Sequence, residues 1–460
     1  MTGLSSPGIG SGLDINGIVN KLMTVESRPL TVLAQREASF QARLTAFGSL
    51  KGALAGLQTA ARTLATQSTF TAMTATVSDP AAVSAAATSA AAAGSYNIGV
   101  TTLAKFHSVR SNINVATTSA TFTTGALAVR VGSGAAVNIA IDGTNNTLAG
   151  IRDAINAAGA GVNASIVFDG TAQRLVLTSK TLGSAGAISV TATDSGSGGT
   201  HALGGLASAN LITARAADDA QFSVNGVAIT RSANSVGDVI EGVTFNLTKE
   251  AANATVTVAK NTGAVTSALN VFVKAYNDAT TAIRNMTAYD AANRKAAVLT
   301  GDGTARSIQG QLSGLVQASV AGVSGGISRL SDIGIAVQKD GALATDSGRL
   351  AAALADPGKD LAALFAQTAS GNQGIAVRFD TILEGIVGPS GLIGGRTDGL
   401  NASIKDLHRR ADALNLRLEQ IERRYRAQFA ALDTLVASMT QTSNFLSQQL
   451  ANLPKISSAT

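Results

Sequence analysis

The residues best suited to chemistry in this chain are its three histidines, because imidazole can act as a general base or bind a metal. They are His107, His201 and His408, which are far apart in the sequence, and none stands at a metal-ligand spacing from another. No pattern pairs one of them with a nucleophile, as a catalytic triad would require. Cysteine is absent, which excludes disulfides, thiolate catalysis and Cys-ligated metals.

Other motifs that could bind a cofactor are incomplete. Residues 8–12 begin like a dinucleotide-binding fingerprint, but Leu13 occupies the third glycine position and no strand precedes the motif. Asp142, Asp153 and Asp169 are better explained as turn or cap residues than as metal ligands. We therefore expect no enzymatic activity, no cofactor and no metal, and we look to the structural elements for the function.

The composition points to several modest domains rather than one large core. A chain of 460 residues favours two to four domains. Aromatic residues make up only 4%, and the apolar content is largely Ala, Val and Leu. The net charge of +6 is spread thinly and is not interleaved with aromatics, so we expect no nucleic-acid binding.

The chain also lacks the usual signals for membranes and cleaved export. No apolar run approaches the roughly 18 residues of a membrane span, so no membrane insertion is expected. The first residues, 1–14, have neither a positive n-region nor an apolar h-region. If the protein leaves the cell, it uses a route without a cleaved signal peptide.

Both ends of the chain have helical patterns. A short helix is predicted after Asp14, a plausible N-cap, and Pro29 separates it from a second helix over about 30–64. The region 71–262 is instead rich in Gly, Ser, Thr and Val in alternating runs, which predicts strands. Helical spacing returns from Val265, followed by mixed and glycine-rich sequence up to residue 399.

The middle region contains an apparent internal repeat of strand, turn, helix and strand. In the first copy, 137–143 is the strand and turn, 147–156 the helix, and a strand starts near Val162. In the second copy, 222–226 is the strand and turn, 235–240 starts a helix, and 243–247 is the returning strand. Chance similarity in so biased a composition is the alternative.

The strongest periodic signal is an apolar heptad pattern over 400–453. A four-residue stutter near Phe429 interrupts it, and charge pairs at i,i+4 (Asp406/Arg410, Glu419/Arg423, Glu422/Arg426) predict an exposed outer face. Between Asp433 and Lys455 there is no charged residue. A helix that long spans about 80 Å at roughly 1.5 Å per residue, more than one compact domain can bury.

The apolar stripe that the heptad pattern forms along 400–453 could serve two kinds of contact. An intramolecular pairing with the N-terminal helix would use a coiled-coil seam at Leu407, Leu414, Leu418, Ile421, Tyr425 and Phe429. The N-terminal helix is shorter, so we expect the distal part to contact other protein subunits. The predicted filament or subunit contacts are Ile15, Leu22, Leu432, Val436, Met439, Leu446, Leu450 and Leu453.

Several segments resemble one known family in the right order along nearly the whole chain. The opening at 10–26 and the close at 425–433 resemble the flagellar hook-associated protein 2 family of filament caps. Residues 127–190 are similar to the flagellin IN repeat, with the pair Ile155-Asn156. The stretch 333–365 is similar to the conserved C-terminal region of that family.

The resemblance implies an α+β multidomain protein in which N- and C-terminal helices form a helical, coiled-coil leg with inserted β-rich head domains. The expected segments are 1–70 (N-terminal leg helices), 71–105 with 217–262 (β-rich head domain), 106–216 (inserted β-rich domain with the IN-like repeat), 263–399 (helical or mixed leg domain) and 400–460 (C-terminal coiled-coil helix).

The resemblance also implies function and partners. Family members leave the cell unfolded, through the flagellar export channel. They form a ring, often a pentamer, at the flagellum tip, where they help flagellin fold and insert and prevent its loss. Expected partners are further copies of the chain, flagellin, hook-associated axial proteins and an export chaperone. The alternatives are a hook–filament junction protein or another flagellin-like axial component, or an adhesin whose β domains bind host glycans and which could also act as a cap.

Overall fold

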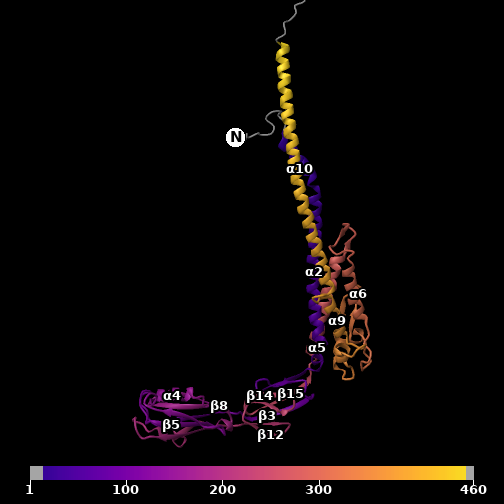
Figure 1. Cartoon of the computed structure of the whole chain (residues 1–460). Coiled ribbons are helices and arrows are strands. Elements are labelled where there is room, and N and C mark those ends of the chain that lie inside the picture. Colours follow the sequence, from indigo (N-terminus) through magenta and orange to yellow (C-terminus); the bar gives the residue numbers. More distant parts are fainter. Residues whose placement is uncertain (1–13, 452–460) are drawn as a thin grey trace, which may run out of the picture. The chain divides into compact units, whose positions relative to one another are not determined.

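A computed structural model describes residues 14–451 of the chain. The fingerprint-like residues 8–12 and the predicted contact Leu453 lie outside the described residues. The chain divides into two compact units: residues 68–263 form one, and the segments before and after them form the other. We call them the β unit and the helical unit (Figure 1). The predicted α+β multidomain class, with long terminal helices and inserted β-rich parts, is confirmed.

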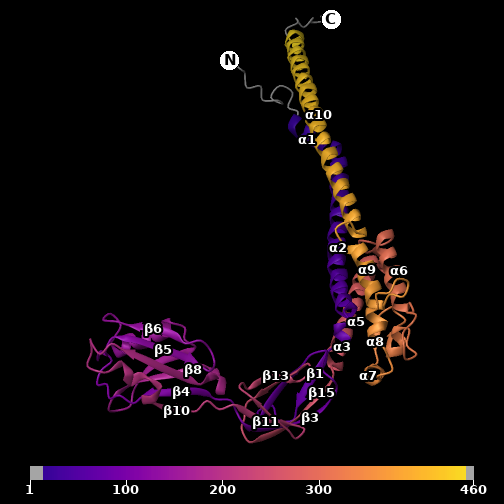
Figure 2. The same ribbon diagram turned by 60° about the horizontal axis from the view of Figure 1, so that its bottom comes forward.

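The helical unit is built on helices from both ends of the chain: α1 (Ile15–Glu26), α2 (Arg28–Ala65) and α10 (Leu392–Ala451). Asp14 caps α1, because its carboxylate accepts a 2.8 Å hydrogen bond from the amide of Gly17. Pro29 lies in the first turn of α2 and separates the two helices as predicted, since that position needs no amide donor. Helix α10 runs beside α2 in both views of the chain (Figures 1 and 2).

Helix α10 begins earlier than the sequence pattern predicted. We expected its start at Leu400, after glycine-rich sequence, but the helix already includes that sequence from Leu392 onward. Each glycine in a helix costs about 1 kcal/mol relative to alanine, so propensity alone predicted a loop. Ile393 and Leu400 are both buried, and their packing overrides this preference.

The rest of the helical unit packs beside these helices. It contains α5 (Thr262–Thr287), α6 (Gly303–Gln317), α7 (Ser347–Ala355), α8 (Leu361–Ala366), α9 (Ile375–Val387) and two short hairpins, β16 (Tyr289–Asp290) with β17 (Lys295–Ala296) and β18 (Ile335–Val337) with β19 (Leu343–Thr345). Phe272 and Phe379 meet edge to face in its core, with ring centroids 5.1 Å apart. Asp340 and Gly341 form the turn between β18 and β19, where Gly341 has a φ of 82°.

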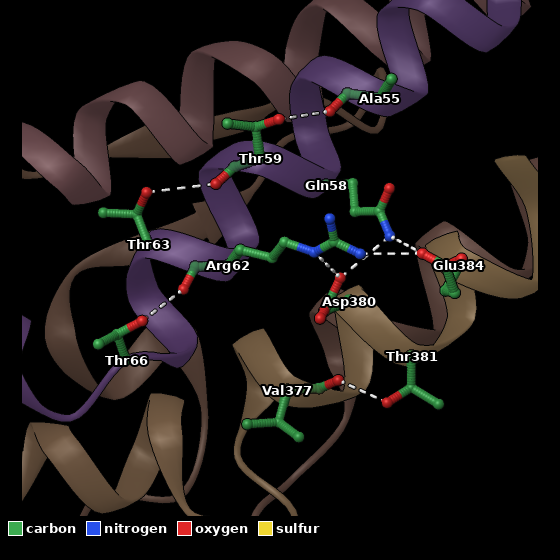
Figure 3. A network of polar contacts seen from close by, with 10 residues as sticks. All are labelled: Ala55, Gln58, Thr59, Arg62, Thr63, Thr66, Val377, Asp380, Thr381 and Glu384. Carbon is green, nitrogen blue, oxygen red and sulfur yellow. Dashed lines mark hydrogen bonds and ion pairs between the residues drawn. The ribbon is translucent and has the colours of Figure 1, made fainter. Parts of the chain in front are cut away.

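A polar network fixes α9 against α2 (Figure 3). Nε2 of Gln58 donates to Asp380 at 3.0 Å and to Glu384 at 2.9 Å. One turn further along α2, Arg62 pairs with the same two carboxylates at 2.8 and 2.9 Å. The hydrogen bond to Asp380 and the charge of that carboxylate hold the pKa of Arg62 above its usual value. Gln58 is buried whereas Arg62 is largely exposed, so the amide is the member that the fold desolvates.

The first part of the β unit is built from two segments far apart in sequence. After α3 (Ser68–Thr71) come β1 (Met73–Val77), β2 (Val83–Ala87) and β3 (Gly94–Thr102), and after an insertion β11 (Ala220–Val224), β12 (Val227–Arg231), β13 (Ser235–Ile240), β14 (Val243–Leu247) and β15 (Ala252–Lys260). They form antiparallel sheets of order β1-β15-β3-β11-β12 and β13-β14-β2. Both segments contribute to one core, with Ile98 and Phe222 among its members.

The insertion has a core of its own. Its elements are β4 (Phe106–Ser111), β5 (Gly125–Val131), β6 (Val137–Ile141), α4 (Leu148–Ala157), β7 (Val162–Phe168), β8 (Gln173–Leu182), β9 (Ile188–Asp194) and β10 (Leu211–Arg215), with short 3-10 turns between them. The sheets have the orders β10-β4-β8-β7 and β6-β5-β9. Buried side chains of α4 and of both sheets, such as Ile151, Leu175 and Val129, form the core.

The Ile-Asn pair at the end of α4 has a clear structural role. Ile155 is fully buried in the core of the insertion. The amide of Asn156 accepts a 2.8 Å hydrogen bond from the backbone nitrogen of Ala164 and donates a 2.9 Å bond to its carbonyl. The isoleucine therefore anchors the helix while the asparagine ties its end to β7, which agrees with the first copy of the predicted repeat.

The second copy of the repeat was predicted incorrectly. Residues 235–240 form strand β13 rather than the start of a helix, and Val236 pairs with Phe245 of β14. In the first copy Thr147 caps α4 by accepting from the amide of Gly150. In the second copy the side chain of Asn234 instead bonds the backbone of Ala104, so it caps no helix. The β-branched residues of 235–240 then favour the extended conformation.

Candidate functional site

The three histidines have structural surroundings. Nδ1 of His107 accepts a 2.8 Å hydrogen bond from the amide of Ile188, and burial lowers the pKa of this imidazole. His201 lies beside the ring of Phe122, and His408 bonds Glu37. Each histidine thus contacts a different part of the chain, and they do not converge on one site.

The aspartates singled out in the sequence also have local roles. Asp142 accepts from the amide and hydroxyl of Thr144, and these bonds lower the pKa of its carboxyl. Asp169 accepts from Thr171 and pairs with Arg174 at 2.7 Å, which lowers its pKa strongly. Asp153 pairs with its neighbour Arg152 on α4. Within residues 14–451 no group of three or more His, Asp or Glu side chains could hold a metal ion.

Helix α10 packs on α1 and α2 through the residues named as a seam. Hydrogen bonds give the direction of this packing: Tyr425 donates to Glu26 at 3.1 Å, and His408 lies 2.6 Å from Glu37. As the numbering of α10 falls, that of its partner rises, so the helices are antiparallel. Leu407 and Leu418 are buried, and Leu414, Ile421, Tyr425 and Phe429 are half-buried.

Beyond Phe429 the apolar side chains of α10 are largely exposed in the single chain. Met439 is 65% exposed, Leu446 54% and Leu450 68%, while Val436 is half-buried. Leu432 is also exposed, as are Leu435 and Phe445, which the heptad count did not select. A stretch of helix that has no charged residue after Asp433 and so many exposed apolar side chains indicates a surface that other proteins cover. We call Leu432, Leu435, Val436, Met439, Leu446 and Leu450 the distal stripe.

The two N-terminal residues named as contacts are placed differently. Ile15 is only 2% exposed, and α1 packs on α10 around it. Its side chain is thus already used within the chain. Leu22 is half-buried. Sequence spacing could not separate these cases, because both residues lie on the apolar side of the same short helix.

The exposed face of α10 carries the predicted ion pairs at i,i+4. They join Asp406 to Arg410 at 2.7 Å, Glu419 to Arg423 at 3.3 Å and Glu422 to Arg426 at 2.8 Å. Pairs so exposed contribute only about 0.3–0.5 kcal/mol each.

In the part of the chain that the structure describes, no helix is both long enough and apolar enough to cross a membrane.

Comparisons with known families cover most of the chain. Residues 11–107 match the family described as flagellar hook-associated protein 2 N-terminus, and residues 217–441 match flagellar hook-associated protein 2 C-terminus. Between them, residues 112–181 match the flagellin hook IN motif. The order of these matches is the order expected from the sequence.

Individual relatives match over the full length. The chain is 32% identical to B-type flagellar hook-associated protein 2 of Pseudomonas aeruginosa, covering 99% of this chain and 98% of that protein. It is 33% identical to flagellar hook-associated protein 2 of Escherichia coli (strain K12), covering 98% and 99%. A crystal structure of the D1-D2-D3 domains of the flagellar cap protein FliD from Escherichia coli matches with a TM-score of 0.63 at 31% identity, covering 77% of this chain and 99% of that one.

Proposed function

Since the chain belongs to the flagellar hook-associated protein 2 family, of which a solved Escherichia coli member is a flagellar cap protein, we propose that it is the structural cap at the distal end of a bacterial flagellar filament. The full-length match in the expected order carries this proposal. The names of the relatives do not favour a hook–filament junction protein or a flagellin. The relatives are structural proteins, and we propose a non-enzymatic role for this chain as well.

The finer proposal concerns partners. The cap is a homo-oligomer, with a pentameric ring as the expected form, that helps exported flagellin subunits fold and insert and prevents their loss. The distal stripe supports this, because it offers exposed apolar side chains without charge to neighbouring helices. We assign Leu432, Val436, Met439, Leu446 and Leu450 to contacts with flagellin or hook-associated axial proteins, together with the half-buried Leu22.

Location and export form a separate part of the proposal. The protein is secreted and acts outside the cell, at the flagellum tip, and an export chaperone binds it before secretion. For the domains, we propose that 71–105 with 217–262 forms one and 106–216 another. The separate hydrophobic cores of these segments support the division. The remaining segments, 1–70, 263–399 and 400–460, form the leg.

A strain lacking this gene tests the proposal. Without the cap, cells should export flagellin monomers into the medium and carry no filaments, and the full chain expressed from a plasmid should restore both. Electron microscopy counts the filaments, and immunoblotting of the medium measures the lost flagellin. Normal filaments on the deletion strain would contradict a capping role.

A further inference from the structure

Arginines gather on one flank of the antiparallel pair formed by α2 and α10. On α10 they immediately precede Ala411, Leu418 and Tyr425, which recur every seven residues in the heptad pattern. On α2 they immediately precede Glu37 and Leu44, which are half-buried and also seven residues apart. Reversing one helix brings these two flanks to the same side of the pair. We call this set the arginine flank; its members are Arg36, Arg43, Arg410, Arg417 and Arg424.

Few counter-charges lie on the arginine flank. Arg410 pairs with Asp406 at 2.7 Å. Arg424 lies over the ring of Tyr425, with its guanidinium carbon 5.7 Å from the centroid. Among the residues that the structure describes, Arg36, Arg43, Arg417 and Arg424 form no ion pair.

Two of these arginines, Arg36 and Arg410, stand at nearly the same height on the two helices. The contact between His408 and Glu37 sets the level of the two helices. Arg36 precedes Glu37 by one residue, and Arg410 follows His408 by two residues. Because the helices are antiparallel, both displacements run in the same direction along the pair. At roughly 1.5 Å per residue their backbone positions differ in height by about 1.5 Å. Like charges at one level repel, so this flank favours an acidic partner.

The opposite flank of α10 supplies acidic groups. Helical geometry puts Asp412, Glu419 and Glu422 on this side, and we call these three residues the acidic flank. Lys405 and Arg426 lie on the same side of the helix. Asp412 has no ion pair with any described residue. Glu419 pairs only with Arg423, at 3.3 Å, and both side chains are mostly exposed. These carboxylates are therefore available to a cation from outside the chain.

The two flanks match in spacing and in height. Arg410 and Arg417 are seven residues apart, as are Asp412 and Glu419, so each interval is about 10.5 Å along the helix. Each acid lies two residues, about 3 Å, beyond the arginine of its pair. Two copies standing side by side and parallel, without an axial shift, would thus bring both pairs together. A closed ring requires this equality of height, whereas an axial shift would generate a helix.

We propose that the arginine flank of one copy binds the acidic flank of a second copy, side by side and in a head-to-tail sense around the ring. The inference deepens the proposed homo-oligomeric cap and rests on it. The contact uses a different surface from the distal stripe, so one copy can bind its neighbour in the ring and a filament subunit at the same time.

Charge reversal in the full chain tests this contact. One variant carries Arg410→Glu with Arg417→Glu, and a second carries Asp412→Arg with Glu419→Arg. Sedimentation velocity at about 50 mM salt should show association weakened about tenfold or more for each variant alone. An equimolar mixture of the two should associate again, because each contact between unlike variants joins opposite charges, although a five-membered ring keeps one contact between like variants. The control, Arg306→Glu with Lys339→Glu, reverses two exposed cations elsewhere in the helical unit and should associate like the wild type.

Several outcomes would overturn the proposal. These are a wild-type chain that stays monomeric, reversed variants that associate normally, or a mixture that fails to recover although each variant keeps its helical circular dichroism. High salt should also weaken wild-type association, because exposed ion pairs are screened. Capping in the deletion strain is scored separately. A chain that caps filaments but ignores charge reversal would refute this contact and leave the proposed function intact.

Discussion

Nε2 of His408 lies 2.6 Å from Oε1 of Glu37, although 371 positions separate the two residues in sequence. Glu37 stands at a seam position of α2 between the apolar Leu33 and Phe40. The two side chains are 55% and 40% exposed, so the contact lies at the edge of the apolar seam and adds only modestly to the packing. It shows which turn of α10 lies against which turn of α2 in the antiparallel pair.

The same helix should respond differently to leucine truncation in its two halves. Leu418 is 7% exposed in the seam, so Leu418→Ala should lower the free energy of unfolding by about 2–5 kcal/mol. Leu446 is 54% exposed, so Leu446→Ala should change that free energy by no more than about 0.5 kcal/mol in the isolated chain. Urea denaturation followed by circular dichroism measures both. Equal losses for the two variants would show that the distal half is covered within the chain.

Removing the amide that bridges α2 and α9 should destabilise the helical unit. Gln58→Ala leaves Asp380 and Glu384 with Arg62 alone, and we expect a loss of about 1–3 kcal/mol, because hydrogen bonds from a buried donor to charged acceptors disappear. Hydrogen exchange of α2 and α9 in the full chain would report it. Gln41→Ala, at an exposed position of the same helix, is the matched control and should leave exchange unchanged.

Sequence patterns predicted the elements whose signal is local. Helical spacing, the Asp14 cap and Pro29 located α1 and α2, heptad spacing located most of α10, and the first copy of the repeat located α4. Contacts between distant residues had no such signal. Gln58 and Asp380 are 322 positions apart, so nothing in the spacing of either helix points to their bond. The helix predicted at 235–240 failed for a related reason: the side chain of Asn234 bonds the backbone of Ala104, in the loop between β3 and β4, 130 positions away.

Stability of the β unit should fall at mildly acidic pH because of His107. Its Nδ1 accepts from the amide of Ile188, which only the neutral ring can do, and burial holds its pKa below the ordinary 6.5. The unfolded chain therefore takes up this proton first. The stabilising contribution is present above about pH 6.5 and is lost as the pH falls through the lower folded pKa.

Hydrogen exchange of β9 at pH 7.5 and pH 5, corrected for intrinsic rates, measures this effect. Exchange should accelerate at pH 5 in the wild type, and His107→Gln should reduce the difference, since glutamine does not titrate. His408→Gln, in the helical unit, is the control and should behave like the wild type in β9. An unchanged pH response in His107→Gln would assign the effect to other groups.

The distal stripe should be required for capping but not for folding. Deletion of residues 433–460 removes Val436, Met439, Leu446 and Leu450, and leaves the seam and both cores of the β unit in place. In a strain without the chromosomal gene, this truncated chain should fail to restore filaments, while its β unit keeps the exchange protection of the full chain. A truncated protein that restores normal filaments would refute the contact assigned to the stripe.

Substitutions separate the stripe from the mere length of α10. Leu446→Gln with Leu450→Gln keeps the helix but replaces two exposed apolar side chains, and should reduce filament number as the deletion does. Gln448 lies about 160° round the helix from Leu450, at roughly 100° per residue, so Gln448→Ala should cap normally. Because Leu446 and Leu450 are mostly exposed in the single chain, any loss of function in their double variant reports a contact with another subunit rather than a folding defect.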